Sequence, residues 1–266
     1  MTLRVRPHAP DDDGCVLDIT PQTAGWSHVG FKVVKLDAGQ THEGGSADRE
    51  ACLVILTGRA DVTVAGVKFA EIGERMSVFE DVAPAAVYVP AGAEYSIVAL
   101  TPVEIGIGSA PGAAGEEPRL IDPTRMSREV RGYGTNQRYV RNILPETEPA
   151  NSLLVVEVIT PGGHWSSYPP HKHDTATAGE ETVLEETYYH RLNPPQGFAF
   201  QRVYTDDREI DETVAVEDGD VVMVPRGYHP AGAAHGYDLY YLNVMAGPTR
   251  QWIFRNDPAH DWISKK

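Results

Sequence analysis

The chain has 266 residues, enough for one large domain or for two domains of ordinary size. Its 38 acidic and 23 basic residues give a formal net charge of −15, which disfavours binding to nucleic acid or to anionic membranes. It has no secretion signal and no apolar run that could span a bilayer, and two cysteines cannot form a disulfide framework, so we expect a soluble, cytoplasmic protein.

Short apolar runs that end at glycine or proline turns follow one another along the whole chain, a pattern typical of β-strands. No segment has a long helical period, and short helices are expected only around 123–130. The sequence therefore predicts an all-β fold. The predicted strands are 53–56, 60–64, 87–89, 95–100, 153–159, 187–192, 198–205, 221–224 and 239–245.

A weak internal repeat relates the two halves of the chain. Residues 218–229 resemble 82–94, because in both a strand runs into a Pro-x-Gly-x-x turn. A repeat at about half the chain length predicts two similar barrels. We place the N-terminal barrel at 1–110, a connector at 111–150 and the C-terminal barrel at 151–266.

Histidines cluster in the C-terminal half. If His171-Lys172-His173 is extended, both imidazoles point to one face of the chain. Glu185 or Glu186 opens the strand that follows, and His229 stands just after the strand 221–224. Three imidazoles and one carboxylate predict a site for one divalent ion, and Zn, Mn, Fe and Ni all suit this ligand set.

The N-terminal half lacks this set. His42-Glu43 is its nearest approach to His-x-His, Glu94 stands where the repeat would place His229, and Glu50 has no paired imidazoles. We therefore predict a structural N-terminal barrel without an intact metal site.

Residues 163–174, 185–190 and 200–208 resemble the 5-deoxy-glucuronate isomerase family of inositol catabolism, as does Arg131-Gly132-x-Gly134 in the connector. This family is a bicupin, with two jelly-roll (cupin) barrels, and is related to the 4-deoxy-L-threo-5-hexosulose-uronate ketol-isomerases. The resemblance implies that the chain converts 5-deoxy-D-glucuronate into 5-dehydro-2-deoxy-D-gluconate.

The resemblance also implies a ligand set. Glu186 is preferred to Glu185 because the related isomerases place their glutamate directly before an aromatic strand. The spacer from His173 to this glutamate is longer than is usual in cupins, so 174–184 is expected to be a polar loop. The implied metal ligands are His171, His173, Glu186 and His229.

Further site residues follow from strand alternation and from the charge of the substrate. Glu186, Tyr188 and His190 share one face of their strand and are the candidate catalytic residues. A sugar-acid carboxylate calls for a guanidinium. The candidate substrate-binding residues are Arg202 and Arg208, with Arg226 third, together with Tyr241 and Asn243.

Three alternatives remain. An iron-dependent cupin dioxygenase would use a similar ligand set but needs oxygen, an isomerase of a related uronate would use the same chemistry, and a non-enzymatic cupin would bind or store a ligand. The fold class alone suggests a homo-oligomer, because barrels of this type often associate through edge strands.

Overall fold

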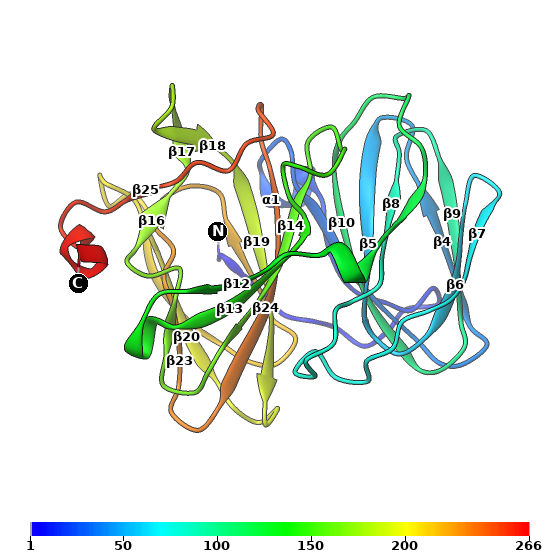
Figure 1. Cartoon of the computed structure of the whole chain (residues 1–266), viewed down its shortest axis with the longest axis horizontal. Helices are drawn as coiled ribbons and strands as arrows, with labels where there is room; N and C mark the ends of the chain where they lie inside the picture. The colour runs from blue at the N-terminus through cyan, green and yellow to red at the C-terminus, as the bar shows by residue number, and fades with distance from the viewer. Residues whose placement is uncertain (1, 266) are drawn as a thin grey trace. The chain divides into compact units, whose positions relative to one another are not determined.

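The computed structural model describes residues 2–265, and its regular secondary structure is almost entirely β-strand (Figure 1). The all-β prediction is therefore confirmed. The chain divides into two compact units, which we call the N-terminal unit (Pro7–Ser127 and Asn142–Val155) and the C-terminal unit (Met1–Arg6, Arg128–Arg141 and Val156–Lys266). Over residues 2–265, no helix is both long enough and apolar enough to cross a membrane.

The expected connector, 111–150, is shared between the units. Residues 128–141 belong to the C-terminal unit, because two strands from this stretch extend its sheet, whereas 142–155 belong to the N-terminal unit. The helix expected near 123–130 is a single 3-10 turn, because residues 128–131 pair as a strand instead. The helical segments of the described chain are α1 (Pro21–Ala24), η1 (Pro123–Arg125), η2 (Gly134–Asn136) and η3 (Asp261–Lys265).

Two sheets enclose the core of the N-terminal unit. In β6 (Ala60–Val64) three buried residues alternate with two half-exposed ones, the pattern of a strand with one face in a core. The six-stranded sheet has the order β11 (Arg119–Ile121), β8 (Ala86–Val89), β5 (Arg49–Thr57), β10 (Val103–Pro111), β3 (Gly30–Leu36) and β2 (Cys15–Ile19). The four-stranded sheet has the order β4 (Thr41–Gly45), β9 (Glu94–Ala99), β6 and β7 (Val67–Ile72).

Glu50 is fully buried at the start of β5, and its carboxylate accepts four hydrogen bonds. Tyr88 Oη and the backbone nitrogen of Asn151 lie 2.5 and 2.7 Å from Oε2. The backbone nitrogens of Ser152 and Leu153 lie 2.5 and 2.7 Å from Oε1. Glu50 thus ties residues 151–153 to the sheet, and both of its oxygens are engaged in structural hydrogen bonds.

The C-terminal unit has the same two-sheet plan with two added ribbons. The larger sheet has the order β1 (Arg4–Val5), β22 (Val221–Val224), β19 (Glu185–Asn193), β24 (Asp238–Ala246), β14 (Leu154–Thr160), β13 (Arg138–Leu144) and β12 (Arg128–Arg131). The smaller sheet has the order β15 (Trp165–Ser166), β23 (Ala231–Ala233), β20 (Ala199–Tyr204) and β21 (Asp211–Val216). The ribbons pair β16 (His171–Lys172) with β25 (Arg255–Asn256), and β17 (Asp174–Thr177) with β18 (Glu181–Val183).

The insertion at 174–184, expected to be a polar loop, is the hairpin β17–β18. Buried Glu181 organises it, because its Oε1 accepts hydrogen bonds from the backbone nitrogens of Asp174 (2.8 Å) and Thr175 (2.9 Å). Lys172 does not face solvent as a simple strand pattern implies; its Nζ lies 2.6 Å from Asp174 Oδ1 and 3.1 Å from Asp206 Oδ2. A local group of acidic side chains thus anchors the chain directly beside the histidine pair.

Candidate metal centre

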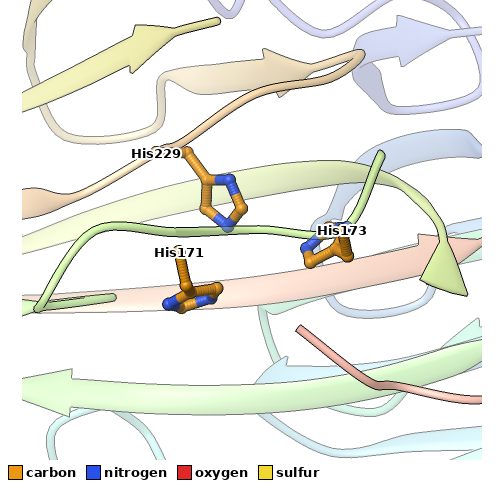
Figure 2. Close-up of side chains that lie close together, drawn as sticks. All are labelled: His171, His173 and His229. Atoms are coloured by element: carbon orange, nitrogen blue, oxygen red, sulfur yellow. The ribbon is translucent and has the colours of Figure 1, made fainter. Parts of the chain in front are cut away.

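Three histidines converge inside the C-terminal unit (Figure 2). His171 lies in β16, His173 follows that strand directly, and His229 lies in the turn between β22 and β23. One ring nitrogen from each lies within 4.8 Å of the others, and all three side chains are buried. Figure 2 shows His229 reaching from its own segment toward the segment that carries His171 and His173. The structure thus brings together the three imidazoles selected from the sequence.

Glu186 lies against two of these three imidazoles. It is the second residue of β19, and its side chain is 1% exposed. Its Oε2 lies 3.1 Å from His173 Nε2 and 3.2 Å from His229 Nε2. Glu185, the alternative ligand, points to the opposite side of β19 because successive side chains in a strand alternate.

Backbone carbonyls orient two of the imidazoles. His173 Nδ1 lies 3.0 Å from the carbonyl oxygen of Leu184, and His229 Nδ1 lies 2.8 Å from that of Gly227. With Nδ1 of each ring at a carbonyl oxygen, each Nε2 points toward Glu186 Oε2. The turn requires glycine at 227, because its φ is +94° and a Cβ there would lie 2.5 Å from the carbonyl oxygen of Tyr204. The Pro-x-Gly-x-His motif therefore encodes the position of His229.

The electrostatics of the group suit a cation. Burial, with the neighbouring imidazoles, holds the pKa of His171 well below its usual range, and burial lowers that of His229 to about 4. Burial is the largest influence on the pKa of His173 and acts to lower it, but the hydrogen bond and the charge of Glu186, together with the Leu184 carbonyl, raise that pKa overall. His229 Nε2 is buried and has no hydrogen-bond partner among the residues that the structure describes. Two imidazoles held neutral by burial, and a third beside a buried carboxylate, fit a divalent transition metal.

Aromatic side chains line the inner wall beside this group. Tyr188 pairs across the sheet with Asn243, and His190 pairs with Tyr241. The ring of Tyr188 lies 5.7 Å from His229, 4.9 Å from Tyr241 and 5.9 Å from His190, measured between centroids. The structure therefore places all four of these sequence-predicted residues on one interior surface next to the histidines.

The two tyrosine hydroxyls have hydroxyl partners. Tyr188 Oη lies 2.9 Å from Ser167 Oγ, and Tyr241 Oη is hydrogen-bonded to Ser166 Oγ. Burial raises the pKa of both tyrosines, so both hydroxyls remain protonated at neutral pH. The two serines were not selected as site residues, although they stand in the Trp-Ser-Ser-Tyr stretch of the motif before His171.

Gln201 also belongs to this surface and was not selected from the sequence. Its Oε1 lies 2.9 Å from His190 Nε2, which leaves His190 Nδ1 buried without a hydrogen bond. Burial lowers the pKa of His190 to about 4, so this ring is neutral. The alternation of β20 could have identified Gln201, because it shares a face with the core residues Ala199 and Val203.

The structure does not bring the three selected arginines to the histidine group. Arg202 lies on the other face of β20, where Nε and Nη2 lie 2.8 and 2.9 Å from the two carboxylate oxygens of Asp211. The guanidinium of Arg208 lies over the ring of Tyr204, 4.3 Å from its centroid. Arg226 Nη2 lies 2.6 Å from Glu209 Oε2.

Known proteins resemble this chain over nearly its whole length. The model of the KduI/IolB family matches residues 3–263. A 5-deoxy-glucuronate isomerase from Geobacillus kaustophilus is 54% identical over 261 residues, 98% of this chain and 95% of the relative. The crystal structure of an IolB-like protein from Salmonella typhimurium has a TM-score of 0.96 at 51% identity and covers 99% of this chain and 100% of that chain.

A more distant likeness concerns the fold alone. Oxalate decarboxylase from Bacillus subtilis has a TM-score of 0.65 at 14% identity, over 95% of this chain and 78% of that chain. With the two-sheet plan of both units, this likeness confirms the predicted bicupin fold.

Proposed function

The chain belongs to the KduI/IolB family, and from this premise we propose that it is a metal-dependent isomerase that converts 5-deoxy-D-glucuronate into 5-dehydro-2-deoxy-D-gluconate in inositol catabolism. The observation that carries this proposal is the buried group of three imidazoles and one carboxylate in a chain 54% identical to a relative named for that reaction.

His171, His173, Glu186 and His229 would hold one divalent ion, for which Zn, Mn, Fe and Ni are all suitable. An ion there supplies Lewis-acid polarisation of the substrate carbonyl and its neighbouring hydroxyl. The carbonyl oxygens of Leu184 and Gly227 keep two of the ligands in one tautomer and one orientation. All four of these side chains are buried.

The reaction moves one hydrogen between adjacent carbons and one proton between their oxygens. Tyr188 and Tyr241 are neutral donors held by serine hydroxyls, suited to donate hydrogen bonds to substrate oxygens. His190 Nδ1 is a neutral acceptor, oriented by Gln201, that has no hydrogen-bond partner within residues 2–265. His190 and Glu186 are therefore the side-chain candidates for moving a proton, with Tyr188 as its relay.

The test is anaerobic turnover of 5-deoxy-glucuronate, followed by NMR in deuterated water with metal analysis of the same sample. We expect turnover to the equilibrium mixture without oxygen or reductant, and deuterium in the product if an enediol route is used. A strict requirement for oxygen would favour the dioxygenase alternative and overturn the proposal. If the protein turned over only a different uronate, the proposed reaction type would stand and the proposed substrate would be wrong.

Several expectations remain predictions. These are the cytoplasmic location, the homo-oligomer and the absence of nucleic-acid binding. The substrate-binding roles of Arg202, Arg208 and Asn243 also remain predictions. Asn243 Nδ2 lies 3.4 Å from the carbonyl oxygen of Thr187.

A further inference from the structure

Two arginines face one another across the hairpin β12–β13 of the C-terminal unit. Arg131 and Arg138 are direct cross-strand partners in its register. Like charges directly opposite on two strands destabilise the pairing. Burial lowers the pKa of Arg138, and the charge of Arg131 adds to that effect. Such a pair needs a counter-charge or a function.

The positive charge of Arg131 already has a carboxylate and an aromatic ring beside it. Its Nε lies 2.9 Å from Glu129 Oε2, and its guanidinium lies over the ring of Trp252, 5.0 Å from the centroid. Arg138 differs: Nη1 donates to the carbonyl oxygens of Asn136 (3.1 Å) and Tyr168 (3.2 Å). Among the residues that the structure describes, no carboxylate forms an ion pair with Arg138, although the chain carries 38 acidic residues.

The hairpin is shaped to admit this guanidinium. Gly132 has a φ of +76°, and a Cβ there would lie 2.3 Å from the carbonyl oxygen of Asn136 and 2.8 Å from Arg138 Nη1. Any side chain at 132 would displace the arginine or the turn that supports it. The Arg131-Gly132-x-Gly134 motif, which the metal centre does not use, therefore has a physical role in placing Arg138.

Contacts connect both arginines to the histidine group. Tyr168, which accepts the hydrogen bond from Arg138, stands three residues before His171. On the other side, Trp252 lies 6.1 Å from Phe254, and Phe254 lies 4.5 Å from His171, between ring centroids. Phe254 is 42% exposed, so this edge of the group reaches the surface.

We propose that Arg138, with Arg131 beside it, binds the carboxylate of the sugar-acid substrate at the edge of the histidine group, an inference that rests on the proposed function. A guanidinium matches a carboxylate through two parallel hydrogen bonds, and Arg138 Nη2 and Nε are left for this purpose. In a chain of net charge −15, an anion needs such a local positive site. The bound carboxylate also relieves the repulsion between the two arginines.

The test compares a charged with an uncharged substrate. Wild type, Arg138→Gln, Arg138→Lys and the control Arg128→Gln are assayed with 5-deoxy-glucuronate and with 5-deoxy-glucose, in which a hydroxymethyl group replaces the carboxylate. Arg128 is the matched control because it lies in β12 but faces the opposite side from Arg131 and is exposed. Circular dichroism and metal content are measured for each protein, and Arg138→Lys serves if Arg138→Gln does not fold.

We expect Arg138→Gln to lower kcat/KM for 5-deoxy-glucuronate by about 10- to 100-fold, mainly through KM, and to change that for 5-deoxy-glucose by less than about 3-fold. Arg138→Lys keeps the positive charge but not the planar guanidinium, so its kcat/KM for 5-deoxy-glucuronate should fall by less. Arg128→Gln should match wild type. Equal losses for both substrates in the arginine 138 variants would overturn the proposal, as would the same selective loss in Arg128→Gln.

Calorimetric titration of wild type and Arg138→Gln with D-glucuronate and with D-glucose separates this inference from the proposed function. If wild type isomerises neither test substrate but prefers glucuronate over glucose, and Arg138→Gln loses that preference, the carboxylate site stands and the proposed reaction fails. If wild type has no such preference, or the variant retains it, the carboxylate site fails whatever the activity.

Discussion

Replacing Glu50 by glutamine tests whether this buried carboxylate is a structural group of the N-terminal unit. In Glu50→Gln the amide oxygen can still accept from the backbone nitrogens of Ser152 and Leu153. The new NH2 group faces two donors, Tyr88 Oη and the backbone nitrogen of Asn151. The tyrosine hydroxyl can rotate and accept, but the N–H of Asn151 cannot.

The magnitude follows from these contacts. The N–H of Asn151, in a part-buried hydrogen bond, loses its acceptor, which costs about 1–3 kcal/mol, and the remaining hydrogen bonds lose the strength that an ionised acceptor provides. We therefore expect the free energy of unfolding to fall by about 2–4 kcal/mol. Tyr88→Phe removes one donor and leaves the carboxylate three, so its cost should be nearer 1 kcal/mol.

Guanidinium chloride unfolding, followed by circular dichroism and by fluorescence, measures this loss. Trp26 is the tryptophan of the N-terminal unit and reports on its unfolding. Glu94→Gln is the matched control, because Glu94 is exposed and should change stability by less than about 0.5 kcal/mol. Metal content and turnover of folded Glu50→Gln should equal wild type. An unchanged stability, or a loss of bound metal, would refute the structural role.

His229→Ala should abolish bound metal and turnover but keep the circular dichroism spectrum of wild type, and full activity in a metal-free preparation would refute the mechanism. Tyr188→Phe should lower kcat by roughly 10-fold or more at unchanged metal content, because it removes a proton donor but no ligand; an unchanged kcat would show that this hydroxyl is not used. Chelation should lower the melting temperature, and adding a divalent metal back should restore it, since an ion at 1,000 times its Kd stabilises the fold by about 4 kcal/mol; a melting temperature insensitive to chelation would argue against a resident ion.

Much of the fold could be predicted because the strands obey simple alternation. The strands expected at 60–64 and 221–224 match β6 and β22 residue for residue. The histidine group could be predicted because its members lie in two short motifs, His-x-His and Pro-x-Gly-x-His. In the second motif, Gly227 supplies the positive φ that the turn before His229 requires. Local sequence determines these features.

The features that could not be predicted depend on contacts between distant segments. The hairpin β17–β18 requires Glu181 to cap it and Lys172 to neutralise it, and a polar composition does not reveal either contact. The position of Arg138 depends on the pairing of 128–141 with a sheet formed by residues far along the chain. Arg202 was selected for its charge, although the alternation that buries Gln201 places Arg202 on the opposite face.

The most direct test of the central claim is anomalous X-ray diffraction from crystals of the purified protein, collected at the absorption edges of Mn, Fe, Ni and Zn. We predict one anomalous peak, at about 2.0–2.3 Å from an imidazole nitrogen of each of His171, His173 and His229 and from an oxygen of Glu186. Crystals of active enzyme with no peak among these four side chains, or with the peak elsewhere in the chain, would contradict the account.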